Sequence, residues 1–173
     1  MAKVFVSIGS NIDRERHIGA ALDALVRFFG PLDISSVYES EAVGFDGDNF
    51  FNLVAAFETQ LPVGELSVLL KKIEDENGRC RQGPKFSGRT LDIDILTYDQ
   101  LCGLIDGVQL PREEIRYNAF VLQPLAELVP SECHPEDKVP YAEMWGAYDR
   151  SLQQLWTVPF AWQRVNLPAS VNG

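Results

Sequence analysis

Apolar and polar residues alternate along several short stretches of the chain, as expected for strands with one buried face. In a strand, successive side chains point to opposite faces of the sheet. The alternation predicts strands at about 3–8, 33–40, 50–59 and 88–96. In the third of these, Phe51, Leu53, Ala55 and Phe57 share one face, while Phe50, Asn52 and Val54 lie on the other.

Two segments between these strands repeat their apolar residues with the period of a helix. The first, ending near Phe29, has a stripe formed by Ile18, Ala21, Leu22 and Leu25. Ser10 and Asp13 have capping-box spacing at its start, and Gly30-Pro31 ends it. The second runs from near Pro62 to Gly78, with a stripe formed by Leu66, Leu69, Leu70 and Ile73.

The order strand-helix-strand-strand-helix-strand predicts an α+β, ferredoxin-like βαββαβ core, with two helices on one face of a four-stranded, mostly antiparallel sheet. A short extended piece near 107–111 and a helix near 118–128 are expected next. Residues 131–173 hold all three tryptophans but show no clear period. We expect a single domain over 1–173, with a core of about 3–130 and a C-terminal extension.

Composition places the chain among soluble globular proteins. Of its 173 residues, 46% are hydrophobic and 23% are charged, and no apolar run is long enough to span a membrane. The N-terminus leads directly into a strand pattern, so no signal peptide is expected. The three cysteines are an odd number and have no C-x-x-C spacing, so the sequence predicts neither a zinc site nor a disulfide framework. This cysteine content favours a cytoplasmic location.

The negative charge is interrupted by one basic segment. A net charge of −10 argues against general binding to nucleic acid or to an anionic membrane. Residues 77–91, however, contain Arg79, Arg81, Lys85 and Arg89 and no acidic residue. This segment predicts a small bound anion, and a solvated loop explains the charges equally well.

The last predicted strand carries two aspartates on its polar face. Asp92 and Asp94 lie opposite Leu91, Ile93 and Ile95, with Cα atoms roughly 6–7 Å apart. Surface ion pairing, general acid–base catalysis by coupled carboxylates, and a magnesium site are all possible interpretations. We favour magnesium, because this ion commonly takes one or two carboxylates and substrate phosphates, and the basic segment then binds those phosphates.

Several motifs together resemble the 6-hydroxymethyl-7,8-dihydropterin pyrophosphokinases. They are I-G-S-N near the start, V-Y-E-S…G, F-F-N, E-x-x-x-G-R-x-R, G-R-T-L-D-I-D-I-L and F-x-L-x-P-L-x-E-L, and they cover roughly residues 3–130. Members of this family have the ferredoxin-like core. They transfer the pyrophosphoryl group of ATP to the hydroxymethyl group of the pterin and release AMP, in folate biosynthesis.

The resemblance implies roles for particular residues. Asp92 and Asp94 would bind two Mg²⁺ ions, and Arg79 and Arg89 would be catalytic cations that close over the triphosphate. The other implied ATP-binding residues are Glu74, Arg81, Lys85, Ile95 and Arg112. The implied pterin-binding residues are Ser40, Val43, Gly44, Phe50, Asn52, Phe86 and Phe120. The expected partners are ATP and a pterin alcohol, with no nucleic acid and no membrane, and the expected state is a monomer.

The sequence departs from the family pattern at three places. A proline-histidine pair is replaced by L-P-R-E, which places Arg112 and Glu113 near the phosphates, where Glu113 would repel them. The usual W-G-P-R is F-S-G-R, with Phe86, and Glu41 stands where apolar packing is expected. Two alternatives therefore stay open: a diverged enzyme acting on another heterocyclic alcohol, and a non-catalytic pterin- or nucleotide-binding module.

Overall fold

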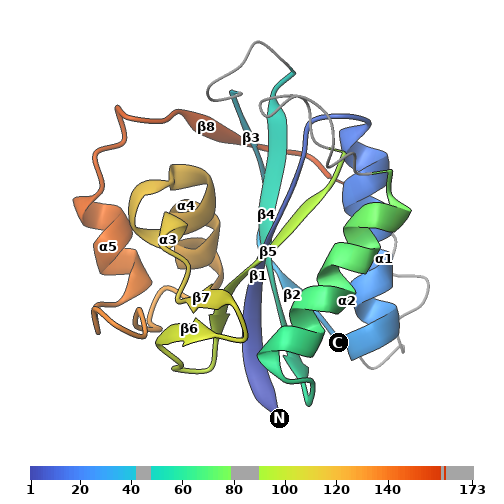
Figure 1. Cartoon of the computed structure of the whole chain (residues 1–173). Coiled ribbons are helices and arrows are strands. Elements are labelled where there is room, and N and C mark those ends of the chain that lie inside the picture. Colours follow the sequence, from blue (N-terminus) through green and yellow to red (C-terminus); the bar gives the residue numbers. More distant parts are fainter. Residues whose placement is uncertain (42–47, 79–89, 161, 163–173) are drawn as a thin grey trace.

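One antiparallel sheet runs through the middle of the molecule (Figure 1). The computed structural model describes residues 1–41, 48–78, 90–160 and 162. Within them, the strands follow the order β5-β1-β4-β3-β8, and β2 pairs separately with β4. Their bounds are β1 (Ala2–Ser10), β2 (Asp33–Ile34), β3 (Val37–Ser40), β4 (Phe50–Thr59), β5 (Asp92–Tyr98) and β8 (Leu155–Val158). A separate hairpin pairs β6 (Gly103–Ile105) with β7 (Val108–Leu110).

Helices cover both faces of this sheet (Figure 1). On one side lie α1 (Arg14–Phe29) and α2 (Val63–Glu76). On the other lie α3 (Glu114–Tyr117), α4 (Ala119–Leu128) and α5 (Tyr141–Ala147). The succession β1-α1-β3-β4-α2-β5, with β1 and β4 in the centre, confirms the predicted ferredoxin-like core.

Alternate residues of the same strands fill two separate apolar cores. The main core, between the sheet and α1 and α2, includes Val6, Leu53 and Ile93. The second core, between the sheet and α4 and α5, includes Phe5 and Val54. The predicted facing of the strands is therefore confirmed, and the layer of α4 and α5 adds a second buried face.

The predicted strand over 33–40 is in fact two short strands. Ser35 lies between them, and its Oγ accepts a hydrogen bond from the Val54 amide at 3.0 Å. The Ser35 amide donates to the Val54 carbonyl at 2.9 Å. Because the serine hydroxyl occupies a place that a backbone carbonyl would take, the regular ladder is interrupted.

The predicted capping box at the start of α1 is wrong. Ser10 is the last residue of β1, and its Oγ donates to the Ile12 carbonyl at 3.1 Å. Asp13 adopts a left-handed conformation, with φ of 49°, and makes no side-chain cap. The predicted helix end is correct: Gly30 has φ of 81°, which suits a glycine, and its amide donates to Val26.

The C-terminal residues without a sequence period also join the fold. β8 pairs with β3 and extends the sheet at that edge, with Leu155 opposite Ser40 and Val158 opposite Val37. None of the helices in the described part of the chain is long and apolar enough to cross a membrane.

Candidate active site

Two predicted site residues, Asn52 and Asp92, fall in one row across the sheet with Gly9 between them. Gly9 of β1 pairs with Asn52 of β4 on one side and with Asp92 of β5 on the other. Directly opposed residues of antiparallel strands share a face, so the side chains of Asn52 and Asp92 lie on the same face. Two strand spacings put their Cα atoms about 10 Å apart. The lack of a side chain at Gly9 makes room for Asn52, since a Cβ added at Gly9 would lie 2.7 Å from Oδ1 of Asn52.

A cavity of about 480 Å³ opens at the β5 edge of the sheet. Its walls come from α2, β5, the β6–β7 hairpin and the residues that lead into α3. Five of the residues expected to bind ATP or metal border it: Glu74, Asp92, Asp94, Ile95 and Arg112. The structure thus brings together residues that lie up to 38 positions apart in the sequence.

Arg112 stands between two carboxylates in this cavity. Its Nε donates to Oε1 of Glu114 at 2.7 Å, and its Nη2 forms ion pairs with the same oxygen at 2.6 Å and with Oδ2 of Asp94 at 3.7 Å. Burial lowers the pKa of Arg112, but the negative charges of Asp94 and Glu114 outweigh burial and raise that pKa overall. Arg112 is thus a fixed cation beside Asp94, held mainly by Glu114.

Glu74 and Ile95 border the cavity in a different way. Glu74 is buried, and its Oε2 accepts a hydrogen bond from the Ile93 amide at 2.7 Å. That amide belongs to the edge strand β5, so Glu74 fastens α2 to the strand that carries the two aspartates. The side chain of Ile95 is buried in the main core.

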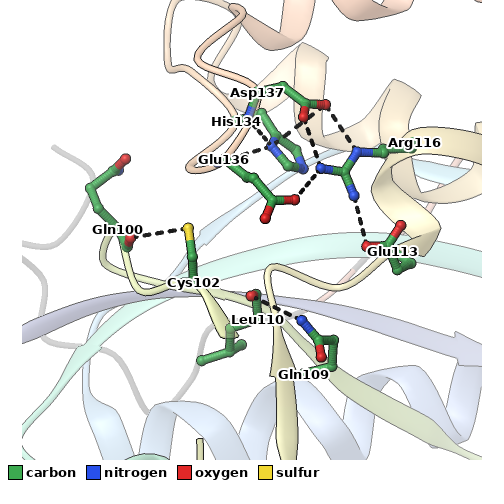
Figure 2. A network of polar contacts seen from close by, with 9 residues as sticks. All are labelled: Gln100, Cys102, Gln109, Leu110, Glu113, Arg116, His134, Glu136 and Asp137. Carbon is green, nitrogen blue, oxygen red and sulfur yellow. Dashed lines mark hydrogen bonds and ion pairs between the residues drawn. The ribbon is translucent and has the colours of Figure 1, made fainter. Parts of the chain in front are cut away.

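The negative charge of Glu113 is balanced by an ion pair with Arg116. Arg116 donates to its Oε1 at 2.7 Å and also binds Glu136 and Asp137, at 2.5 and 2.8 Å, as Figure 2 shows. Hydrogen bonds to Asp137, Glu136 and Glu113 raise the pKa of Arg116, which therefore stays charged. The expected repulsion between Glu113 and phosphate is thereby reduced.

The described residues that were predicted to bind the pterin lie at or near the other end of the row. Asn52 is buried, and its Nδ2 donates to Oγ of Ser40 at 3.0 Å. Phe50 is half-buried and lies on the same face of β4, two residues before Asn52. Phe120, in the first turn of α4, packs partly buried against the second core on that face.

Hydrogen bonds to Glu127 hold α4 against β3 and the residue before it. Glu127 accepts hydrogen bonds from the Tyr38 hydroxyl and the Ser36 hydroxyl, both at 2.7 Å. Burial and the Glu127 carboxylate raise the pKa of Tyr38, so the phenol remains a donor. Two motif residues, the tyrosine of V-Y-E-S and the glutamate of F-x-L-x-P-L-x-E-L, therefore serve to place α4.

The remaining predicted site residues lie outside the described residues. They are Val43, Gly44, Arg79, Arg81, Lys85, Phe86 and Arg89. Glu41 is described and is exposed, so it does not take the apolar packing position expected there.

Sequence reasoning missed a polar chain beside the cavity. Asn118 donates to Oε2 of Glu114 at 2.6 Å, and Gln153 donates to Oδ1 of Asn118 at 3.0 Å. The four-residue spacing of Glu114 and Asn118 was an available signal. Gln153 is 35 residues away from Asn118 and had none.

Comparison with known sequences identifies one family. The chain matches the model of the family described as 7,8-dihydro-6-hydroxymethylpterin-pyrophosphokinase over residues 5–130. The 2-amino-4-hydroxy-6-hydroxymethyldihydropteridine pyrophosphokinase of Aquifex aeolicus is 37% identical over 145 residues, which are 83% of this chain and 90% of the relative. The protein of the same name from Pseudomonas aeruginosa is 36% identical over 79% of this chain and 86% of its own length.

Solved structures share the fold at much lower identity. A crystal structure of an HPPK-DHPS in complex with substrates has a TM-score of 0.68 and 14% identity, over 87% of this chain and 44% of that one. A Plasmodium falciparum HPPK-DHPS triple mutant with pteroate has a TM-score of 0.66 and 13% identity, over 84% and 43%. This chain therefore spans less than half the length of those two proteins, and the likeness concerns the fold.

Proposed function

The chain belongs to the 7,8-dihydro-6-hydroxymethylpterin-pyrophosphokinase family, and from this membership we infer that it transfers pyrophosphate from ATP to 6-hydroxymethyl-7,8-dihydropterin, releasing AMP, in folate biosynthesis. The observation that carries the proposal is the row formed by Asp92, Gly9 and Asn52. It supports a phosphate-binding half and a pterin-binding half on one face of the sheet, a short distance apart.

The phosphate half has the donor set that magnesium prefers. Asp92 and Asp94 are half-buried carboxylates on one strand face, and both border the cavity. Magnesium takes hard oxygen ligands and commonly accepts one or two carboxylates together with substrate phosphates, so these residues fit the ion. We propose that they hold two Mg²⁺ ions with ATP. When bound, magnesium neutralises phosphate charge and orients the triphosphate.

Cationic side chains would bind the rest of the triphosphate. We assign this role to Arg112, which borders the cavity, and to Arg79, Arg81, Lys85 and Arg89. Arginine suits phosphate because its planar group donates two parallel hydrogen bonds. Glu74 and Ile95 complete the proposed ATP site as residues that border the same cavity.

The pterin half would recognise a flat, polar heterocycle. Asn52 can donate and accept hydrogen bonds at the ring, and Ser40 holds its amide in place. Phe50 and Phe120 would supply stacking surface, and we assign Val43, Gly44 and Phe86 to the same pocket.

In the proposed reaction, these residues place the pterin alcohol in line with the β-phosphorus. The alcohol oxygen forms a bond to that phosphorus, the bond to the oxygen bridging the α-phosphate breaks, and AMP leaves with the bridging oxygen. The hydroxyl proton must also leave, and Asp94 is the carboxylate we propose as its acceptor. Positioning and charge stabilisation supply most of the rate in reactions of this class.

The state of the whole protein is likewise a proposal. We propose a cytoplasmic monomer whose residues 1–173 form a single domain. The two described cysteines, Cys102 and Cys133, are free and exposed, which suits a reducing compartment. The pairing of β8 with β3 supports treating the C-terminal segment as part of the same domain.

The decisive experiment resolves the nucleotide products. The chain is incubated with ATP, magnesium and 6-hydroxymethyl-7,8-dihydropterin, and the nucleotides are separated. Formation of AMP supports the proposal, whereas ADP would mean transfer of the γ-phosphoryl group and would contradict it. Nucleotide binding without any product would instead favour the binding module. A dihydropterin with a methyl group in place of the hydroxymethyl group is the control and should give no AMP.

A further inference from the structure

A continuous series of polar contacts leads from Asp94 to the C-terminal segment. Nη2 of Arg112 lies 3.7 Å from Asp94, and Nε of Arg112 donates to Glu114 at 2.7 Å. The second carboxylate oxygen of Glu114 accepts from Asn118 at 2.6 Å, and Oδ1 of Asn118 accepts from Gln153 at 3.0 Å. Glu114 and Asn118 each use one polar atom on the side of the cavity and a second polar atom on the side of Gln153.

The same Gln153 amide binds the start of α4 with its oxygen. Its Oε1 accepts a hydrogen bond from the Ala119 amide at 2.8 Å. This amide is one of those that a helix leaves without an internal partner, and Asn118, which precedes it, makes no side-chain cap. Gln153 therefore caps α4 from a distance, immediately before Phe120.

The position of Gln153 is itself fixed by the sheet. It stands two residues before Leu155, the first residue of β8, which pairs with Ser40. Ser40 in turn accepts the hydrogen bond from Asn52. One side chain is thus connected to the phosphate-side carboxylate, to the helix that carries Phe120, and to the pterin-side strand.

We propose that Gln153 is a positioning residue for both substrates, an inference that rests on the proposed function. It lies outside residues 5–130, which match the family. Gln153 fixes the orientation of the Asn118 amide, and Asn118 in turn fixes the carboxylate of Glu114. Glu114 then keeps Arg112 at 3.7 Å from Asp94. Without this hold, Arg112 closes on Asp94 and competes with magnesium-bound ATP for that carboxylate.

The two roles of Gln153 can be separated by chemistry. Gln153→Ala removes both hydrogen bonds. Gln153→Glu keeps an acceptor for the Ala119 amide but has no donor for Oδ1 of Asn118. Rotating the Asn118 amide to suit the new carboxylate would turn its oxygen toward the carboxylate of Glu114, which is unfavourable. The adjacent Gln154 is exposed, so Gln154→Ala is a matched control.

The test measures KM for ATP and KM for the pterin in each variant. Because each lost hydrogen bond is modest, we expect Gln153→Ala to raise both KM values about fivefold. Gln153→Glu should raise KM for ATP by a similar factor and leave KM for the pterin near that of the wild type. Gln154→Ala should change neither. Adding Gln153→Ala to Asn118→Ala should raise KM for ATP little further, because the same series of contacts is already broken.

Calorimetry with magnesium and a nonhydrolysable ATP analogue provides a readout without turnover, and it should show weaker binding in both Gln153 variants. Unchanged KM values in both variants of an active enzyme, with only a lower melting temperature, would overturn the inference alone. A wild-type chain that forms no AMP would overturn the proposed function as well.

Discussion

The two faces of the central sheet differ in polarity along the same three strands, β1, β4 and β5. Toward α1 and α2, these strands present mainly apolar residues, among them Leu53 and Ile93. Toward α4, the same strands change along their length, from the apolar Val54 to the polar Asn52 and Asp92. A single alternation therefore builds a core on one face and, on the other, a short core next to a candidate active site.

This difference separates the requirements of stability from those of catalysis. The main core needs only apolar volume and good packing. The second face needs a layer that covers its apolar end and leaves its polar end accessible. Two hydrogen bonds place α4 in that way, one from Tyr38 to Glu127 and one from the Ala119 amide to Gln153. Changes on the two faces should consequently affect different measurements.

The largest effect on activity is expected on the polar end. Asp94→Asn keeps the size of the side chain but removes the charge proposed to bind magnesium. We expect turnover to fall by about a thousandfold or more, which is typical for the loss of a charge-stabilising group at a reaction centre. Its side chain is 36% exposed, so the melting temperature should change little. AMP release measures the first quantity, and near-normal turnover would contradict the assignment.

The largest effect on stability is expected on the apolar face. Leu53 is fully buried in the main core, so Leu53→Ala should lower the free energy of unfolding by about 2–5 kcal/mol through lost burial and a cavity. The kcat of the remaining folded protein should stay near that of the wild type. Urea denaturation measures the stability, and Leu104→Ala, at a residue 72% exposed, is the control. A selective loss of kcat would show that the two faces are not separable.

A change at the centre of the row should act on one substrate. In Gly9→Ala, the new Cβ would lie 2.7 Å from Oδ1 of Asn52, so the Asn52 side chain must move. We expect KM for the pterin to rise about tenfold through the disturbed hydrogen bond, with a smaller change in KM for ATP. Gly19→Ala, where a Cβ meets nothing within 4 Å, is the matched control. Equal effects on both substrates would place Asn52 outside the pterin site.

The smallest expected effect concerns the ion pairs of Figure 2. In Arg116→Ala, Glu113 loses its cation and borders the cavity proposed to bind the phosphates with its full charge. Because the Glu113 side chain is 57% exposed, screening limits the repulsion, and we expect KM for ATP to rise only about threefold. Glu113→Gln in the same chain should restore the wild-type KM. A failure of this rescue would assign the effect to the loss of Glu136 and Asp137 as partners.

Local periodicity was sufficient to predict the main face. The strand pattern placed Ile93 on the face away from Asp92 and Asp94, and Ile93 is buried in the main core. In the predicted helical stripe, Leu66, Leu70 and Ile73 are buried, whereas Leu69 is half-buried. These assignments depend on spacings of two or of three to four residues, which are visible in any short window. Arg112 reaches the cavity of the aspartates because the chain returns to β5 after the β6–β7 hairpin, where the Arg112 amide donates to the Leu96 carbonyl at 2.8 Å.

The parts that sequence reasoning missed depend on contacts between distant residues. The break at Ser35 comes from its hydroxyl binding Val54 on a neighbouring strand. The cap by Gln153 joins residues 34 positions apart, and Glu74 bonds to an amide 19 positions away. No short pattern specifies such partners, because any polar side chain at the right place in space can serve.

A structure of the chain with magnesium, a nonhydrolysable ATP analogue and 6-hydroxymethyl-7,8-dihydropterin tests the central claim most directly. We predict metal density at Asp92 and Asp94, the triphosphate in the cavity beside Arg112, and the pterin at Asn52, with its hydroxymethyl group above Gly9 and facing the β-phosphate. A nucleotide bound away from both aspartates, or a pterin that does not contact Asn52, would contradict the account.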